Sequence, residues 1–492
     1  MHRSKLFLFA LIAWFSVMTV CVAQSQYQVV HLTEYMRHGA RTTWLNSLNT
    51  NLTLEVGIGN LTANGVRMQY VLGAQLRETY PSIFKVPWKG TNVKVHSSSV
   101  HRTILSAASQ LMGLFPLGSG EEYPLDDFSK YGLPPFEGLS VSFQNKSALP
   151  HQFRPFAYDI KSEQLDYDFF PGLYHVCPKA RDYANLRTNA KLNKYQYLVI
   201  ELGKEVEALG FNSKKYYNKE VHTVESLAYL FDEANSYYNY YGKYYPGISS
   251  DLHERLYRVS QLNFNFLLPD EKIQRMLADG VARNIVNAID DVVNKRSETK
   301  FTLFSGHDTG IYTHMQLYGL STEDCLVEKF KLNTKSTTEP CHDVPEFASP
   351  FLYELALKGE VYYVRALYIG KAFKICDENE DEYYCEFSKF KKTVEEKLYY
   401  KSDDRIEFCG NPLSLQFKHN TSTHQDIKIA IFAAAFIVLI IFVILVLILC
   451  RISKLKKNLP ELGTGEYKRV NSNSPSIMIP RSPDTNDDDE KL

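Results

Sequence analysis

Residues 27–41 read YQVVHLTEYMRHGAR, and this stretch decides which fold class and which chemistry to expect. Its first ten residues are mostly apolar and predict a buried β-strand. The strand ends by presenting His38 between Arg37 and Arg41. Guanidinium groups offer a planar fork of donors that suits a phosphate, and Gly39 permits a turn or a close backbone approach. The pattern indicates a phosphoryl group held beside a nucleophilic nitrogen.

A second strand-end motif lies about 270 residues further along the chain. Residues 300–310 read KFTLFSGHDTG, an apolar strand that ends at Ser305-Gly306-His307-Asp308 and leads into a helix-like segment. An R-H-G-x-R match alone arises by chance in roughly one chain in several hundred of this length. Ligand-binding groups collect at the carboxyl ends of parallel strands, so we expect the two histidines to lie together.

The order of the expected elements predicts an α/β fold, with a mixed, mostly parallel sheet and helices on both faces. Further strands are expected over residues 93–97 and 362–367, and helices over residues 65–79 and 101–114. The segment between the two motifs is mainly helical in pattern, with helices expected over residues 190–209, 224–234, 252–266 and 271–293. We therefore predict an α/β core from residues 24–116 and 295–410, with an α-helical lid inserted over residues 117–294.

These motifs resemble those of the histidine acid phosphatase family, the branch of the histidine phosphatases with an inserted helical domain. The lysosomal and prostatic types are the most similar. Residues 61–80 and 93–116 resemble two further blocks of the family, and the resemblance extends from about residue 27 to residue 410. It implies that phosphomonoesters are hydrolysed through a phosphohistidine intermediate, without a metal or any other cofactor.

The resemblance also implies a role for each residue of the site. His38 would be the nucleophile, Asp308 the acid that protonates the leaving alcohol, and His307 a hydrogen-bond donor to the phosphate. The phosphate oxygens would be bound by Arg37, Arg41 and Arg102. The family usually has Asp just before the third arginine, whereas this chain has His101. A group that orients one of the arginines would then either be missing or be replaced by one from elsewhere in the chain.

The N-terminal residues predict export from the cytoplasm. Basic side chains precede an apolar run over residues 6–20, and small residues follow it. This is the pattern of a secretory signal peptide, expected over residues 1–23.

The C-terminal part of the chain predicts a membrane anchor. Residues 429–450 are 22 uncharged and mostly apolar residues, enough to cross a bilayer as a single transmembrane helix. Cationic side chains crowd the C-terminal end of this run, which places that end in the cytoplasm. We therefore expect a single-pass type I membrane protein whose large domain is lumenal or extracellular, with a stalk over residues 411–428.

The expected cytoplasmic tail, residues 451–492, is polar and ends in acidic residues, which predicts disorder. Within it, Tyr467 and Val470 form a Y-x-x-Φ sorting pattern, and the tail resembles those of lysosomal acid phosphatases. The resemblance implies recognition by a clathrin adaptor and delivery to the lysosome or endosome. The plasma membrane is the alternative location.

Six of the eight cysteines lie in the expected exported domain, and an even count there predicts three disulfides. The sequence alone leaves many connectivities open. The family resemblance favours Cys177–Cys409 and Cys376–Cys385, which leaves Cys325–Cys341. Sequons of the form N-x-S/T predict glycosylation at Asn51, Asn60, Asn145 and Asn420.

Other chemistries find little support in the sequence. A net charge of −1 argues against a nucleic-acid partner. The chain contains no G-x-S-x-G elbow, C-x-x-C pair or P-loop. The run His253-Glu254-Arg255-Leu256-Tyr257 has Tyr where the H-E-x-x-H zinc motif needs its second histidine.

Two alternative functions stay open at this stage. One is the same fold specialised for inositol polyphosphates or lipid phosphates, and a basic pocket in the lid would favour the inositol phosphates. The other is a receptor-like ectodomain with weak catalysis. Assembly as a homodimer also stays open.

Overall fold

The computed structural model describes residues 27–45, 47–48, 51–85, 88, 90–122, 134–135, 137–138, 146–169, 176–332, 341–377, 383–399, 404–411 and 436–452. The chain divides into two compact units, residues 1–418 and residues 419–492. The predicted signal peptide, the sequons at Asn145 and Asn420, and the sorting pattern at Tyr467 and Val470 lie outside the described residues.

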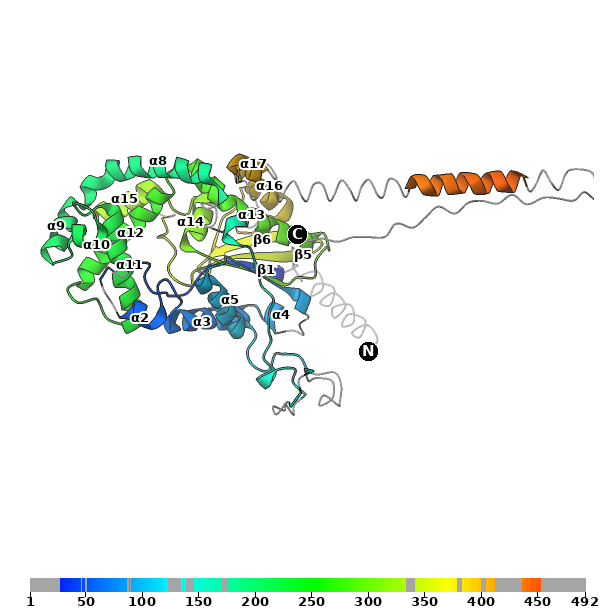
Figure 1. The fold of residues 1–492 in the computed structure, drawn as a ribbon, viewed down its shortest axis with the longest axis horizontal. Coiled ribbons are helices and arrows are strands. Elements are labelled where there is room, and N and C mark those ends of the chain that lie inside the picture. Colours follow the sequence, from blue (N-terminus) through cyan, green and yellow to red (C-terminus); the bar gives the residue numbers. More distant parts are fainter. Residues whose placement is uncertain are drawn as a thin grey trace, which may run out of the picture. The chain divides into compact units, whose positions relative to one another are not determined.

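A mixed sheet forms the centre of the first unit (Figure 1). In spatial order its strands are β3 (Asp159–Ile160), β2 (Val93–Ser97), β4 (Phe301–Gly306), β1 (Gln28–Arg37), β5 (Pro350–Lys358), β6 (Val361–Tyr368) and β7 (Lys371–Phe373), and β8 (Cys385–Glu386) also pairs with β6. The strands β3, β2, β4 and β1 are parallel to one another. From β5 onward each strand is antiparallel to its neighbour.

The prediction of a mostly parallel sheet is therefore wrong. Among the described strands, three pairings are parallel and four are antiparallel. Short turns join β5 to β6 and β6 to β7, where Gly359 and Gly370 have φ angles of 65° and 80°. Parallel strands need a long crossover, so turns this short impose antiparallel pairing. The strand β5 also had no counterpart among the strands expected from the sequence.

Helices cover both faces of this sheet, as predicted (Figure 1). One face carries α3 (Ala63–Thr79), α4 (Pro81–Phe84) and α5 (His101–Leu114), and the other carries α13 (Glu271–Val293), α14 (Asp308–Leu317) and α16 (Phe387–Lys397). Alternate side chains of β1 pack against the helices on opposite faces of the sheet. Leu32 and Met36 belong to the apolar cluster with α3 and α5, whereas Tyr35 belongs to the cluster with α13 and α14.

A helical portion extends from one end of the sheet. It contains α8 (Pro178–Tyr195), α9 (Ile200–Ala208), α10 (Ser213–Tyr217), α11 (Val224–Tyr241), α12 (Ser250–Leu267) and α15 (Glu323–Leu332). The helix α11 packs on α12, and α12 packs on α15. By contrast α13, which we expected in the lid, packs against α14 and β1. The domain boundaries stay a prediction. By these contacts α13 belongs with the core, where we expected it in the lid, and α15 belongs with the lid, where we expected it in the core.

The remaining described elements are short. They are the helices α2 (Leu52–Val56) and α17 (Asp404–Cys409), and 3₁₀ turns at Gly90–Asn92, Pro150–Gln152, Glu163–Leu165 and Gln196–Val199. Three disulfides are present, as the even cysteine count predicted. They join Cys177 to Cys409, Cys325 to Cys341 and Cys376 to Cys385.

In the second unit, residues 436–452 form a helix. The transmembrane helix predicted over residues 429–450 begins outside the described residues. Within the parts of the chain that are described, no helix combines the length and the apolar character needed to cross a membrane.

A buried carboxyl group in β1 makes the stability of the fold depend on pH. Glu34 is fully buried and accepts hydrogen bonds at 2.7–2.8 Å from the amide of Gln110 on α5. Burial raises the pKa of Glu34 from 4.5 to about 8. Between these two pH values the folded chain therefore binds more protons than the unfolded chain, so the contribution of Glu34 to stability falls as the pH rises.

We expect Glu34→Gln to remove this contribution, because the amide stays neutral at every pH. The unfolding free energy of the variant minus that of wild type should therefore rise by roughly 2–4 kcal/mol as the pH increases from 5 to 8. Urea unfolding of both oxidised proteins at the two pH values measures the difference, and contributions from other titrating groups cancel in it. If the unfolding free energies of the two proteins changed equally between pH 5 and pH 8, Glu34 would not be protonated in the folded protein.

Candidate active site

The pairing of parallel strands brings the two histidine motifs together. In the β1–β4 ladder Arg37 lies opposite Gly306, so the residues that follow them, His38 and His307, leave neighbouring strands at the same edge. The backbone N–H of His38 donates to the carbonyl of Gly306 at 3.0 Å, and the two imidazole centroids are 5.5 Å apart. The carboxyl end of β2 reaches the same edge and leads into α5, which carries Arg102.

The loop after β1 is held close to the start of α3. A Cβ on Gly39 would lie 2.3 Å from the carbonyl oxygen of Gly65, and a Cβ on Gly65 would lie 2.2 Å from the carbonyl oxygen of Ala40. Both distances are shorter than any real contact. The close backbone approach predicted at Gly39 is therefore confirmed, and it fixes the position of the neighbouring His38.

His38 has the tautomer that a nucleophile requires. Its side chain is buried, and Nδ1 lies 2.8 Å from the carbonyl oxygen of Gly39. A carbonyl can only accept, so Nδ1 carries the proton and the lone pair is on Nε2. Burial, followed by the positive charges of Arg102 and Arg37, holds the pKa of His38 well below its usual value of 6.5. The imidazole consequently stays neutral in mildly acidic solution.

Arg37 is held by Asp308 and by the loop before β5. Its Nη2 forms an ion pair with Oδ2 of Asp308 at 2.6 Å, and its Nη1 donates to the carbonyl of Pro345 at 2.6 Å. The guanidinium lies 4.2 Å from the ring centroid of Phe347, close enough for a cation–π contact. Asp308 is the first residue of α14, and its Oδ1 accepts from the backbone N–H of Thr309 at 2.8 Å.

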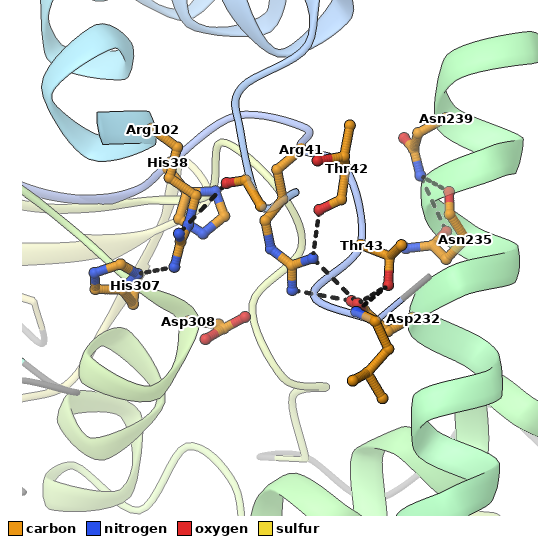
Figure 2. Close-up of polar contacts among 12 residues, drawn as sticks. His38, Arg41, Thr42, Thr43, Arg102, Asp232, Asn235, Asn239, His307 and Asp308 are labelled. Atoms are coloured by element: carbon orange, nitrogen blue, oxygen red, sulfur yellow. Dashed lines mark hydrogen bonds and ion pairs between the residues drawn. The ribbon is translucent and has the colours of Figure 1, made fainter. Parts of the chain in front are cut away.

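Arg41 points away from the sheet toward α11, where it meets Asp232 (Figure 2). Its two terminal nitrogens donate to the two carboxylate oxygens at 3.1 and 2.9 Å. The hydroxyl of Thr43 donates to the same carboxylate at 3.1 Å. Although burial acts to raise the pKa of Asp232, the charge of Arg41 and these hydrogen bonds hold it below its usual value. This bidentate pair fixes the guanidinium of Arg41 against the helical portion.

Arg102 and His307 form a second linked pair. Nη2 of Arg102 donates to Nδ1 of His307 at 3.2 Å, so the ring proton is on Nε2, which lies 3.0 Å from the hydroxyl of Ser98. The guanidinium of Arg102 also lies 4.3 Å from the ring centroid of Trp44. Burial and the charge of Arg102 hold the pKa of His307 well below 6.5. Both nitrogens of His307 are thus engaged. Donation to a phosphate would require the Nε2–H group to leave Ser98, or Nδ1 to gain a proton after Arg102 has left it.

The site has buried donors that lack acceptors. The Nε–H groups of Arg37, Arg41 and Arg102 are buried and have no hydrogen-bond partner among the described residues. Leaving such donors unpaired is costly, and an anion with several oxygens would satisfy them. Among the described residues, these three guanidinium groups form ion pairs with two carboxylates, those of Asp308 and Asp232. The site therefore has excess positive charge and unfilled donor capacity, and the charges of these three arginines act on His38.

The site opens into a cavity of about 740 Å³. The three arginines, His307 and Asp308 line its inner end, and residues of α11, α12 and residues 344–347 line the rest. Among the described residues, no cluster of three or more His, Cys, Asp or Glu side chains is arranged to hold a metal ion.

Comparison with known proteins identifies the family. The model of the histidine phosphatase superfamily (branch 2) matches residues 22–369. The chain belongs to this family. The resemblance first seen in the two histidine motifs is therefore confirmed over most of the chain.

Individual relatives of this histidine phosphatase are distant. The prostatic acid phosphatase of Mus musculus is 27% identical over 164 residues, which cover 32% of this chain and 42% of that protein. The lysosomal acid phosphatase of Xenopus laevis is 30% identical over 115 residues, 23% of this chain and 26% of that protein. Each alignment spans less than half of the relative's length.

Solved structures confirm the fold of the histidine phosphatase. The phytase from D. castellii superimposes with a TM-score of 0.53 at 14% identity, covering 79% of this chain and 83% of that one. The multiple inositol polyphosphate phosphatase of Bifidobacterium longum, in complex with phosphate, gives a TM-score of 0.51 at 14% identity, covering 77% and 94%. At this identity the likeness concerns the fold alone.

The structure brings the six predicted site residues together. Five of them line the cavity, namely Arg37, Arg41, Arg102, His307 and Asp308. The sixth, His38, is buried, and its ring centroid lies 5.5 Å from that of His307. Sequence reasoning missed Asp232 and Trp44, which orient Arg41 and Arg102. No motif surrounds Asp232, so nothing in the sequence marks it.

The residue His101, which stands where the family usually has Asp, is exposed at the start of α5. Of the two described sequons, Asn51 is exposed, whereas the side chain of Asn60 donates to the carbonyl of Val56; glycosylation of either stays a prediction.

The contact between Arg41 and Asp232 makes Asp232 a positioning residue that can be tested. We expect Asp232→Asn to lower kcat for a phosphomonoester roughly ten-fold, because Arg41 loses its bidentate partner and is no longer held in place. KM should change less, since the pocket keeps its three cations. Asp251→Asn, which changes an exposed aspartate on α12 in the same way, is the matched control. A kcat in Asp232→Asn equal to that of the control would contradict the assignment.

Proposed function

We propose that this protein is an acid phosphatase that hydrolyses phosphomonoesters through a phosphohistidine intermediate on His38. One observation carries the proposal. The neutral His38, with its Nε2 lone pair free of the proton, lies in a cluster of three arginines whose buried Nε–H groups have no acceptor. A phosphoryl group would satisfy these donors and place phosphorus within reach of Nε2.

The first step transfers the phosphoryl group to the enzyme. Nε2 of His38 attacks phosphorus, the P–O bond to the alcohol breaks, and protonated Asp308 gives its proton to the departing oxygen. Arg37, Arg41 and Arg102 stabilise the charge on the three non-bridging oxygens. For this, Arg37 exchanges its ion pair with Asp308 for a phosphate oxygen, and the exchange leaves the carboxyl group beside the leaving alcohol.

The second step regenerates the enzyme. Asp308, now a carboxylate, takes a proton from a water molecule that attacks phosphorus from the side the alcohol has left. The P–N bond breaks, the electron pair returns to Nε2, and inorganic phosphate departs. His38 is neutral again and Asp308 is protonated, so protons and charge balance over the cycle.

The roles of His38 and Asp308 are tested by phosphate release. With a phenyl phosphate substrate at pH 5, where His38 stays neutral, we expect turnover by the wild-type protein. His38→Ala should lower kcat by at least roughly 10³-fold. Asp308→Asn should lower it less with phenyl phosphate than with an alkyl phosphate, because phenolate departs without a proton more readily.

Retained activity in His38→Ala would exclude the phosphohistidine route. An Asp308→Asn loss that is the same for both substrates would exclude Asp308 as the proton donor. No turnover by wild type with any substrate would instead favour the receptor-like alternative.

We further propose that the catalytic unit is lumenal or extracellular and that residues 429–450 anchor it in a membrane. The uncharged sequence of that run, the signal-like residues 1–23 and the three disulfides support this location. In the cytoplasmic tail, Tyr467 and Val470 would bind a clathrin adaptor that delivers the protein to the lysosome. A homodimer is compatible with these proposals.

Localisation of the full-length protein in cultured cells tests the anchor and the sorting signal. We expect it to stay in the membrane fraction after alkaline carbonate extraction and to reside mainly in lysosomes. Tyr467→Ala should increase the surface fraction several-fold, with Tyr197→Ala, which removes an exposed tyrosine of the first unit, as the matched control. Release by carbonate would refute the anchor, and an unchanged surface fraction would refute the sorting role.

A further inference from the structure

Beyond the phosphate-binding end, the cavity is lined by aromatic side chains interspersed with polar ones, among them Asn235, Asn239 and Asn263. Tyr229, Phe231 and Tyr238 of α11 face it, together with Tyr257 and Phe264 of α12. Phe347 also lines the cavity, and its ring centroid lies 4.2 Å from the guanidinium of Arg37. Aromatic walls of this kind favour flat, apolar groups, because ring contacts and the burial of apolar surface both contribute.

Among the described residues, the same part of the cavity carries carboxylates and one histidine, His253, but no lysine or arginine. Burial lowers the pKa of His253 below its usual value of 6.5. Within the described part of the chain, the lysines and arginines that line the cavity are Arg37, Arg41 and Arg102, all at its phosphate-binding end. The outer wall carries Glu254 of α12 and Glu346, next to the Pro345 carbonyl that holds Arg37. Glu346 is exposed, and the side chain of Glu254 is 49% exposed.

A cation behind this wall does not reverse its charge. Arg258 is 4% exposed and forms ion pairs with Glu254 at 2.7 Å and with Asp343 at 3.5 Å. Lys329 also pairs with Asp343, at 2.8 Å. The wall and the layer behind it thus contain two cations, Arg258 and Lys329. They also contain three carboxylates, those of Glu254, Asp343 and Glu346. The wall that a leaving group meets is consequently negative.

On the basis of the proposed phosphatase function, we propose that the cavity selects phosphomonoesters with an aromatic leaving group that bears no second phosphate. Glu254 and Glu346 are the residues that reject polyphosphorylated substrates. A second phosphate needs cationic donors, and here it would instead approach two carboxylates in a partly enclosed cavity. The described lining of the cavity therefore has no lysine or arginine in its lid part, where a second phosphate of an inositol polyphosphate would need one.

Binding to the full-length His38→Ala protein tests this selectivity without chemistry, since no phosphohistidine can form. The dissociation constants of phenyl phosphate, glycerol 2-phosphate and inositol hexakisphosphate are measured by calorimetry at pH 5 and 0.15 M salt. We expect phenyl phosphate to bind at least ten-fold more tightly than each of the other two. Equal or tighter binding of inositol hexakisphosphate would overturn the charge selection, and equal binding of glycerol 2-phosphate would overturn the aromatic selection.

Charge reversal identifies the residues responsible. In the same background, Glu254→Lys with Glu346→Lys should tighten the binding of inositol hexakisphosphate at least ten-fold. The matched control is Glu395→Lys with Glu396→Lys, which adds the same charge on exposed positions of α16, outside the cavity. Equal effects of the two double variants would show that only net charge matters and would refute the assignment.

These binding constants are independent of turnover. Failure of the proposed phosphatase activity would appear as absent phosphate release by the wild-type protein. Failure of the selectivity would appear only in the ratios of the dissociation constants.

Discussion

The parallel pairing of β1 with β4 is the constraint on which the rest of the site depends. With Arg37 opposite Gly306, the ladder delivers His38 and His307 to one edge, and the N–H of His38 is bonded to the carbonyl of Gly306. The strand β2, paired on the other side of β4, brings Arg102 to the same edge. A register shift of one residue would turn these side chains to the opposite face of the sheet. The backbone hydrogen bonds of the sheet thus fix which side chains come together in the site.

Electrostatic balance explains how three arginines can be buried together beside a neutral histidine. Asp308 and Asp232 compensate two of the positive charges, and aromatic rings contact the guanidiniums of Arg37 and Arg102. The remaining excess charge and the unpaired Nε–H groups favour an anion. Burial and, after it, the same positive charges hold the pKa of His38 well below its usual value. One arrangement therefore both attracts the phosphate and preserves the nucleophile.

Asp232 links this chemistry to the helical portion. Because it belongs to α11 and binds Arg41 after β1, the wall that meets the leaving group also orients a phosphate-binding residue. Movement of α11 would therefore disturb both functions together. Chemistry and substrate selection are consequently coupled through a single ion pair.

The elements that were predicted well are those with strong local patterns. Three elements have the bounds that we expected, namely the strand Val93–Ser97 and the helices His101–Leu114 and Glu271–Val293. Their apolar periodicity can be recognised from consecutive residues alone. The antiparallel strand β5 was missed. The helix α13 was expected in the lid although its buried face packs on the sheet. Periodicity indicates that a face is buried but not what covers it.

The sequence by itself determined which groups we propose to react in this protein. His38 and Asp308 lie in short motifs at strand ends, and their chemistry follows from residue type and spacing. Only the tertiary structure decided how these groups are held and what can reach them. Arg41 and Asp232 are 191 residues apart, and the cavity joins α11, α12 and residues 344–347. Contacts between such distant segments depend on how whole elements pack, and no local pattern in the chain records them.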